Sequence, residues 1–197
     1  MPADRRRRLV EVAAAEFATA GFENASLNNI ISQCGMSKSS FYYLFASKSD
    51  LFGFVVRELM DSGAAEIAIP APEEFAGHDF WRLLEEFFWE LVRASQQHEA
   101  FLTLGRMFYS DTPDAAKATV TEVWAGVRAW VEEVLRVGRR SGVVRDDLPE
   151  ALQYSLTFRI LQVFDEWAVA HFDDFAPAEL HALADAQFAT IRRLLGV

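Results

Sequence analysis

The sequence predicts an all-helical protein of about nine helices, and three features of its pattern lead to this prediction. Apolar side chains recur at intervals of three and four residues through most of the chain, which is the spacing of one helix face. No stretch alternates apolar and polar residues as a half-buried strand does. Glycine or proline stands where the helical spacing stops, as at Gly35, Pro70 and Pro113. With 197 residues, the chain is long enough to bury a sizeable core.

Four helices are expected first, over about residues 4–20, 27–34, 38–45 and 48–69. Ser26, Ser37 and Ser47 precede three of them, and a serine hydroxyl at such a position can accept a hydrogen bond from a free amide of the opening turn. Gly35 ends the second helix, because glycine most easily takes the left-handed conformation found there. Two short helices joined by a glycine-containing turn form a helix-turn-helix, whose second helix enters the major groove of DNA.

Five more helices are expected in the remainder of the chain, over about residues 80–91, 101–108, from after Pro113 to 140, 149–172 and 177–195. Large apolar side chains line one face of each. Pro149 and Pro177 each suit the first turn of a helix. We therefore expect a three-helix domain over residues 1–50 and a larger helical domain over residues 51–197.

The charge distribution indicates which end of the chain can approach nucleic acid. The formal net charge is −10, which by itself argues against a nucleic-acid partner. Residues 1–50, however, hold six basic and five acidic side chains, against 13 basic and 24 acidic ones in the rest. Because phosphate repels the acidic part, DNA is expected to meet only the N-terminal end.

The stretch from Phe17 to Leu51 resembles the DNA-binding segment of the tetracycline-repressor (TetR) family of bacterial transcription regulators. The matching residues keep the family spacing without gaps, and they are Phe17, Gly21, Phe22, Ile30, Cys34–Lys38, Ser40–Tyr42, Phe45, Ser47, Lys48 and Leu51. Ile31 and Cys34 stand where the family mostly has alanine, so the two short helices are expected to pack slightly further apart. Ser39 stands where glycine or another small residue is usual. The resemblance covers about the first quarter of the chain.

The resemblance implies a DNA-binding site made of Ser26, Asn28, Ser37, Lys38, Ser39, Ser40, Tyr42, Tyr43 and Lys48. Tyr42 and Lys48 would contact phosphate. Lys38, Ser39 and Tyr43 would lie towards base edges, and Asn28 matches a position that can reach a base. These side chains suit the task, since lysine can donate to guanine, asparagine can pair with adenine and a tyrosine ring can touch a thymine methyl group.

The alternative is that these residues are simply the exposed side of a helix. Two adjacent tyrosines, Tyr42 and Tyr43, argue against it, because Phe41 and Phe45 already supply the apolar face. Arg5–Arg8 leave two possibilities open: a solvated, frayed chain start, or a basic arm that reaches phosphate or the minor groove.

For the larger domain, the resemblance implies an effector cavity whose candidate lining is Phe88, Phe108, Trp124, Phe158, Phe164 and Asp165. An aromatic lining would suit a small, largely apolar or aromatic effector. Asp165 and Glu166 would favour a cationic or hydrogen-bonding ligand if one of them were buried, and otherwise are solvated or paired.

The resemblance also implies a homodimer through the last two helices. Two recognition helices about 34–36 Å apart would then read a palindromic operator. The expected function is therefore a ligand-responsive DNA-binding regulator with a small-molecule effector, and repression is the commoner outcome in the family.

Other functional classes find little support in the sequence. His78, His98, His171 and His181 do not fall at metal-binding spacing, and no nucleophile elbow, phosphate-binding loop or dinucleotide fingerprint is present. No catalytic residue, metal or cofactor is expected. A scaffold protein would leave Lys38 without a role.

The basic N-terminal stretch lacks the apolar run and small-residue cleavage site of a signal peptide, and the longest apolar runs are short and broken by charges, so neither a signal peptide nor a membrane span is expected. A single cysteine, Cys34, fits a reducing cytoplasm and is expected to be a small core residue rather than a redox sensor. A cytoplasmic location is therefore expected.

Overall fold

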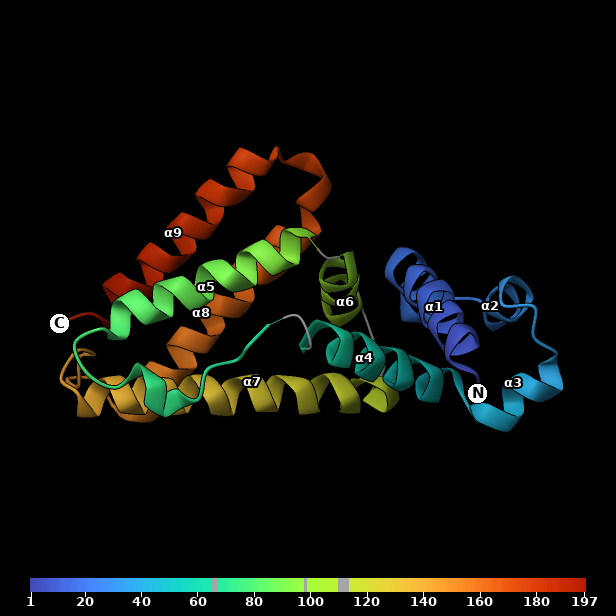
Figure 1. Ribbon diagram of the computed structural model, residues 1–197, viewed down its shortest axis with the longest axis horizontal. Helices are drawn as coiled ribbons and strands as arrows, with labels where there is room; N and C mark the ends of the chain where they lie inside the picture. The colour runs from blue at the N-terminus through green and yellow to red at the C-terminus, as the bar shows by residue number, and fades with distance from the viewer. Residues whose placement is uncertain (65–66, 98, 110–113) are drawn as a thin grey trace. The chain divides into compact units, whose positions relative to one another are not determined.

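The computed structural model describes residues 1–64, 67–97, 99–109 and 114–197. Within these ranges the chain forms nine α-helices and no sheet, which confirms the predicted fold class. The helices are α1 (Ala3–Asn24), α2 (Leu27–Gln33), α3 (Lys38–Leu44), α4 (Lys48–Ala64), α5 (Phe80–Gln97), α6 (Glu99–Tyr109), α7 (Asp114–Arg140), α8 (Glu150–Ala170) and α9 (Pro177–Leu195) (Figure 1). Two short 3-10 helices, η1 (Pro72–Phe75) and η2 (Phe172–Asp174), lie in the connections.

Several predicted helix ends differ from those in the structure. The first helix continues past residue 20 to Asn24, across a kink at Gly21, which has a positive φ of 70°. The fourth helix was expected to reach about residue 69, but residues 67–69 are not helical. The fifth helix extends to Gln97 rather than 91, because its amphipathic pattern continues through Ala94, which is buried.

The helices form two compact units. The first unit comprises Met1–Glu66 and His98–Val123, and the second comprises Ile67–Gln97 and Trp124–Val197. Helix α6 therefore groups with the N-terminal helices, where it packs against α1 and α4. The expected domain boundary at residue 50 stays a prediction.

The core of the first unit contains a cluster of three phenylalanines. The Phe52 ring lies edge-on to Phe17 and Phe22, with centroids 5.1 and 5.5 Å away, and all three side chains are buried. Edge-to-face rings add to the stabilisation that burial itself provides. This cluster joins the kinked end of α1 to α4.

The second unit has an aromatic core of its own. Phe75 in η1 contacts Phe80, Phe87 and Trp130, so that η1, α5 and α7 meet in one place. The indole N–H of Trp130 donates to the carbonyl of Pro70 at 2.9 Å, which satisfies a half-buried polar group. Helix α9 packs against α8 and α5.

Candidate nucleic-acid interface

The helix-turn-helix begins with two capped helices, as the sequence predicted. The Ser26 hydroxyl accepts a hydrogen bond from the Asn29 amide at 3.3 Å, and the Ser37 hydroxyl accepts one from the Ser40 amide at 3.1 Å. Between the helices, Gly35 has a φ of 60°, a left-handed conformation that costs glycine nothing. The amide of Met36 donates to the carbonyl of Ile31 at 3.0 Å and closes the turn.

The inner face of α3 is aromatic and fully packed. Phe41 is buried beside Phe45, and the Phe45 ring lies 5.2 Å from Phe54 in α4. Ile30 and Ile31 bury the corresponding side of α2. The angle at which α3 leaves the unit is therefore set by large apolar contacts.

The outer face of α3 carries the polar side chains that the sequence singled out. Lys38 and Ser39 are exposed, and the exposed fractions of Tyr42 and Tyr43 are 54% and 89%. The Tyr42 ring packs edge-on against Phe41 with centroids 5.4 Å apart, whereas Tyr43 projects into solvent. This face therefore presents two phenol groups and one ammonium group to solvent.

The three serines around the start of α3 bond to one another. The Ser37 hydroxyl lies 3.0 Å from that of Ser39 and 2.8 Å from that of Ser40. Their oxygens are thus held at the N-terminus of the helix. Asn28, on α2, is also exposed.

The four arginines Arg5–Arg8 make different contacts. Arg6 is paired with Glu58 of α4, with Nε 2.6 Å from Oε2, and its guanidinium lies over the Phe54 ring. Arg7 pairs with Asp4 at 2.9 Å. Arg5 and Arg8 have no hydrogen bond or ion pair to the described residues. Arg6 is therefore anchored to the body of the first unit.

Lys48 lies in an arrangement that the sequence did not reveal. Its Nζ donates to the carbonyls of Phe22, Glu23 and Ala25 at 2.8, 2.9 and 3.0 Å. An ammonium group has three N–H donors, so all of them are used. The predicted phosphate contact of Lys48 would compete with these bonds.

Glu16 is a second residue that sequence reasoning missed. One carboxylate oxygen accepts from the backbone amide of Ser26 at 2.8 Å, and the other accepts from the Asn29 side chain at 2.6 Å. A carboxylate at the start of α2 is favoured by the positive end of the helix dipole. No local pattern marks this contact, since the residues are 10 and 13 positions apart.

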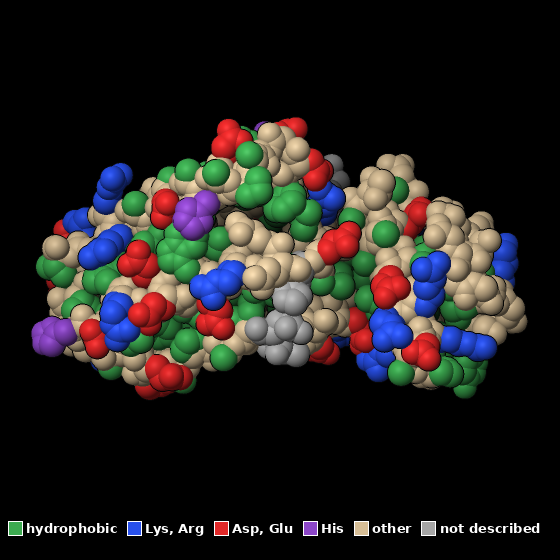
Figure 2. Space-filling model, turned by 45° about the horizontal axis from the view of Figure 1, so that its top comes forward, with side chains coloured by type: hydrophobic (Ala, Val, Ile, Leu, Met, Phe, Trp, Pro, Cys, Tyr) green, Lys and Arg blue, Asp and Glu red, His purple; other side chains and the backbone are tan. Residues whose placement is uncertain are grey.

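Basic side chains of the first unit are mixed with acidic ones. On the face shown in Figure 2, Lys and Arg side chains lie over the N-terminal helices beside Asp and Glu side chains. This mixture agrees with the near balance of charge in residues 1–50.

The six predicted effector contacts are divided between the two units. Phe108 lies in α6 of the first unit, whereas Phe88, Trp124, Phe158, Phe164 and Asp165 lie in the second. Trp124 contacts the buried Phe158 ring at 5.7 Å, while Phe88 packs on Phe188 at 5.4 Å. Asp165 is exposed rather than buried. These contacts are those of core packing, and the assignment of an effector site stays a prediction.

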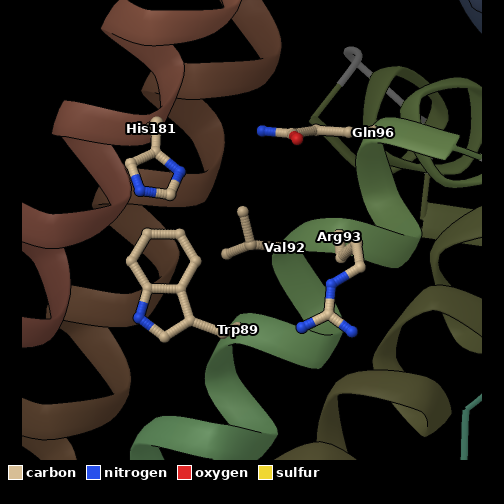
Figure 3. A pocket seen from close by; sticks show the side chains of 5 residues that line it. All are labelled: Trp89, Val92, Arg93, Gln96 and His181. Atoms are coloured by element: carbon tan, nitrogen blue, oxygen red, sulfur yellow. The ribbon is translucent and has the colours of Figure 1, made fainter.

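Two hollows of the second unit are lined by other residues. The larger, of about 310 Å³, is bordered by Trp89, Val92, Arg93, Gln96 and His181, and the His181 ring stacks on the Trp89 indole at 4.3 Å (Figure 3). The smaller, of about 190 Å³, is bordered by Pro70, Glu74, Phe75, Leu83, Glu86, Phe87 and Glu90. Neither includes a predicted effector contact.

The described residues contain neither a metal-binding cluster nor a membrane-spanning helix. No group of three His, Cys, Asp or Glu side chains in these ranges is arranged to hold a metal ion. None of the helices described is both long and apolar enough to span a membrane.

Comparison with known proteins agrees with this geometry. Residues 9–53 match the sequence model of the "Bacterial regulatory proteins, tetR family". A curated relative, the uncharacterized HTH-type transcriptional regulator YdgC of Bacillus subtilis (strain 168), is 34% identical over 55 residues. That match covers 28% of this chain and 28% of the relative.

Solved structures extend the likeness to the whole fold. A TetR family transcriptional regulator from Pseudomonas syringae pv. tomato str. DC3000 has a TM-score of 0.67 at 21% identity, with 100% of both chains covered. NalD of Pseudomonas aeruginosa has a TM-score of 0.72 at 15% identity, covering 98% of this chain and 97% of its own. Residues 9–53 therefore form a DNA-binding segment of the tetR family of bacterial regulatory proteins, and the described chain has the fold of solved TetR family regulators.

Proposed function

We propose that this protein is a ligand-responsive transcription repressor that binds a palindromic operator as a homodimer. The observation that carries the proposal is the outer face of α3, where Tyr43 is 89% exposed beside Lys38 and Tyr42. A large aromatic side chain that reaches solvent from a rigid helix has no packing role there. The family match of residues 9–53 supplies its partner, which is the major groove of duplex DNA.

In the proposed complex, α3 lies in the groove and its side chains divide the contacts. Lys38, Ser39 and Tyr43 face base edges, and the phenol of Tyr42 donates to a phosphate. Asn28 contacts a base from α2. Ser26 and Ser37 hold the helix starts, so their effect on DNA passes through the geometry of α2 and α3.

Homodimer formation is proposed through α8 and α9. Leu152, Leu156, Val163 and Trp167 are large apolar side chains of α8 that remain exposed. At about 100° per residue they fall within roughly 60° of one another around the helix. Ala178, Ala182 and Ala186 are exposed on α9 and would allow a second helix to approach closely. An apolar stripe of this kind is typical of a surface that a partner covers.

Effector control is proposed for the second unit, with a small, largely apolar or aromatic ligand. Its support is the number of aromatic contacts there, including Trp124 with Phe158 and Phe88 with Phe188. NalD, one of the similar folds, is named as the secondary repressor of a multidrug efflux pump. At 15% identity that likeness shows the fold alone.

Selection of genomic fragments by the purified protein tests the DNA function. Fragments of the source genome are incubated with the protein, recovered and sequenced, and the best site is footprinted. We expect an inverted repeat whose half-sites are one helical turn apart. Binding that ignores sequence, or absence of binding at low salt, would rule out the operator proposal.

The effector proposal needs its own measurement. Small aromatic compounds that raise the melting temperature are added to the protein bound to the selected duplex. A true effector is expected to change DNA affinity about 5–150-fold, which is the usual range of such coupling. Compounds that bind tightly and leave DNA affinity unchanged would contradict effector control at that site.

A further inference from the structure

We propose that Lys48 is a positioning residue for the recognition helix α3 and makes no phosphate contact of its own. The proposal rests on the proposed DNA-binding function and concerns the same site. It follows from two charged side chains, Lys48 and Glu16, that both form hydrogen bonds at the connection between α1 and α2. The last residues of α1 and the connection that follows, together residues 22–26, are called the α1–α2 segment below.

Lys48 bonds to carbonyls at the end of α1 that would otherwise have no hydrogen-bond partner within the helix. The oxygens of Phe22, Glu23 and Ala25 converge on Nζ within 3.0 Å, and the ammonium lies 5.2 Å from the centre of the Phe22 ring. The last carbonyls of a helix have no partner in the helix and carry partial negative charge. A single cation therefore bonds to the end of α1 and to the α1–α2 segment together.

Glu16 forms hydrogen bonds at the start of α2. Its carboxylate accepts from the Ser26 amide and the Asn29 side chain, and Asn29 in turn accepts from the Gln33 side chain at 3.1 Å. These bonds run from α1 along α2. The α1–α2 segment is thus bonded to α4 through Lys48 and to α1 through Glu16.

These bonds can influence α3 because α3 is joined directly to both α2 and α4. Helix α3 is attached to α2 through the turn at Gly35, and it leads into α4, whose first residue is Lys48. Both ends of α3 therefore lead to helices that the α1–α2 segment holds. Loss of the Lys48 bonds would let the start of α4 move relative to α1, and the outer face of α3 would move with it.

Salt dependence separates positioning from phosphate contact. Each ammonium that neutralises a DNA phosphate adds about 0.9 to the slope of log affinity against log salt concentration, because a counterion is released. A lysine whose three donors stay on carbonyls adds nothing to that slope. Its loss would weaken binding by the same factor at every salt concentration.

Two substitutions use this difference. Lys48→Met removes the charge and keeps the length, while Lys48→Arg keeps the charge but offers a planar group that cannot direct three donors to the same carbonyls. We expect both variants to bind the selected duplex roughly tenfold more weakly, as for a modest energetic coupling, with the wild-type slope between 50 and 200 mM KCl. Lys38→Met is the matched control on the exposed face of α3: the Lys38 ammonium enters the groove and displaces counterions even while it faces base edges, so loss of this charge is expected to lower the slope, by at most about 0.9.

Two outcomes of these binding measurements would contradict the proposal or the function on which it rests. If Lys48→Met lowers the slope and Lys48→Arg restores affinity, Lys48 contacts phosphate and the positioning role is wrong. If the wild-type protein binds no duplex, the proposed function fails instead, and the measurement below still tests the bonds of Lys48.

A direct measurement covers the case in which a variant does not fold. The lysines of the chain are Lys38, Lys48 and Lys117, so a ¹³C-labelled protein with ¹⁵N in its lysines gives few ammonium signals. We expect the Lys48 signal to show slow hydrogen exchange and scalar couplings to the carbonyl carbons of Phe22, Glu23 and Ala25, both free and on DNA. Loss of those couplings when DNA binds would overturn the proposal.

Discussion

Replacing Tyr43 by alanine should remove sequence recognition while leaving the fold intact. The Tyr43 side chain is 89% exposed and belongs to no buried cluster. Its truncation is therefore expected to change the free energy of unfolding by less than about 0.5 kcal/mol, as for other surface substitutions. The neighbouring Phe41 gives the contrast, because it is fully buried and its replacement by alanine should cost about 3–5 kcal/mol.

The effect on DNA is expected to be much larger than the effect on stability. A base-edge contact contributes about 1–3 kcal/mol of discrimination, so each half-site should lose about 5–150-fold in preference for the selected sequence. Affinity for an unrelated duplex should change little, since non-specific binding comes from phosphate contacts. The difference between specific and non-specific affinity is thus the quantity that Tyr43 controls.

Fluorescence anisotropy with the selected duplex and a scrambled one measures both affinities at one salt concentration. Thermal unfolding by circular dichroism establishes that the variant is folded at the assay temperature. Tyr43→Phe separates the ring from the hydroxyl, because it should retain contact with a thymine methyl group and lose any hydrogen bond. A Tyr43→Ala protein that distinguishes the two duplexes as well as the wild type does would refute base recognition by this residue.

Three further predictions concern other parts of the molecule. Gly138→Ala should destabilise the second unit by about 1–3 kcal/mol, seen as a lower melting temperature, because a Cβ there would lie 2.5 Å from Val144 and 2.8 Å from the Phe80 ring; an unchanged or higher melting temperature would show that this contact relaxes. Burial raises the pKa of the Cys34 thiol although Arg8 opposes the shift, so the thiol should stay protonated at pH 7 and react with iodoacetamide more slowly than free cysteine, with a rate that rises with pH and levels off only above that raised pKa; a rate equal to that of free cysteine would contradict this. Val163→Glu should shift the protein from dimer to monomer in analytical ultracentrifugation while leaving its helix content unchanged, because Val163 is 61% exposed on the apolar stripe of α8; a dimer of undiminished affinity would place the interface elsewhere.

The parts of the fold that the sequence predicted well depend on local chemistry. Ser26 and Ser37 cap their helices because a serine hydroxyl reaches an amide three residues ahead, whatever the rest of the chain does. The division of α3 into a buried side with Phe41 and an exposed side with Tyr43 follows from helical spacing alone. Both features could therefore be read before any tertiary contact was known.

The parts that could not be predicted depend on which helices meet. Phe108 lies on an apolar stripe that looks like those of the second unit, yet α6 packs against α1 and α4. Periodicity identifies the buried face of a helix but not the partner that buries it. For the same reason, the aromatic residues predicted as effector contacts were chosen by residue type, and in the structure Trp124 packs on Phe158 while Phe88 packs on Phe188.

Lys48 shows why a family motif and a physical role must be argued separately. The motif predicts that a lysine stands here, and a lysine near DNA suggests phosphate contact. The same ammonium is also the right size and charge to collect three carbonyls at the end of a helix 23 to 26 residues earlier in the chain. Each phosphate contact would have to replace at least one of these bonds, leaving a carbonyl of the α1–α2 segment without a partner. The contact with DNA is therefore expected to come from side chains whose donors are free, such as Lys38, while Lys48 sets the angle at which they arrive.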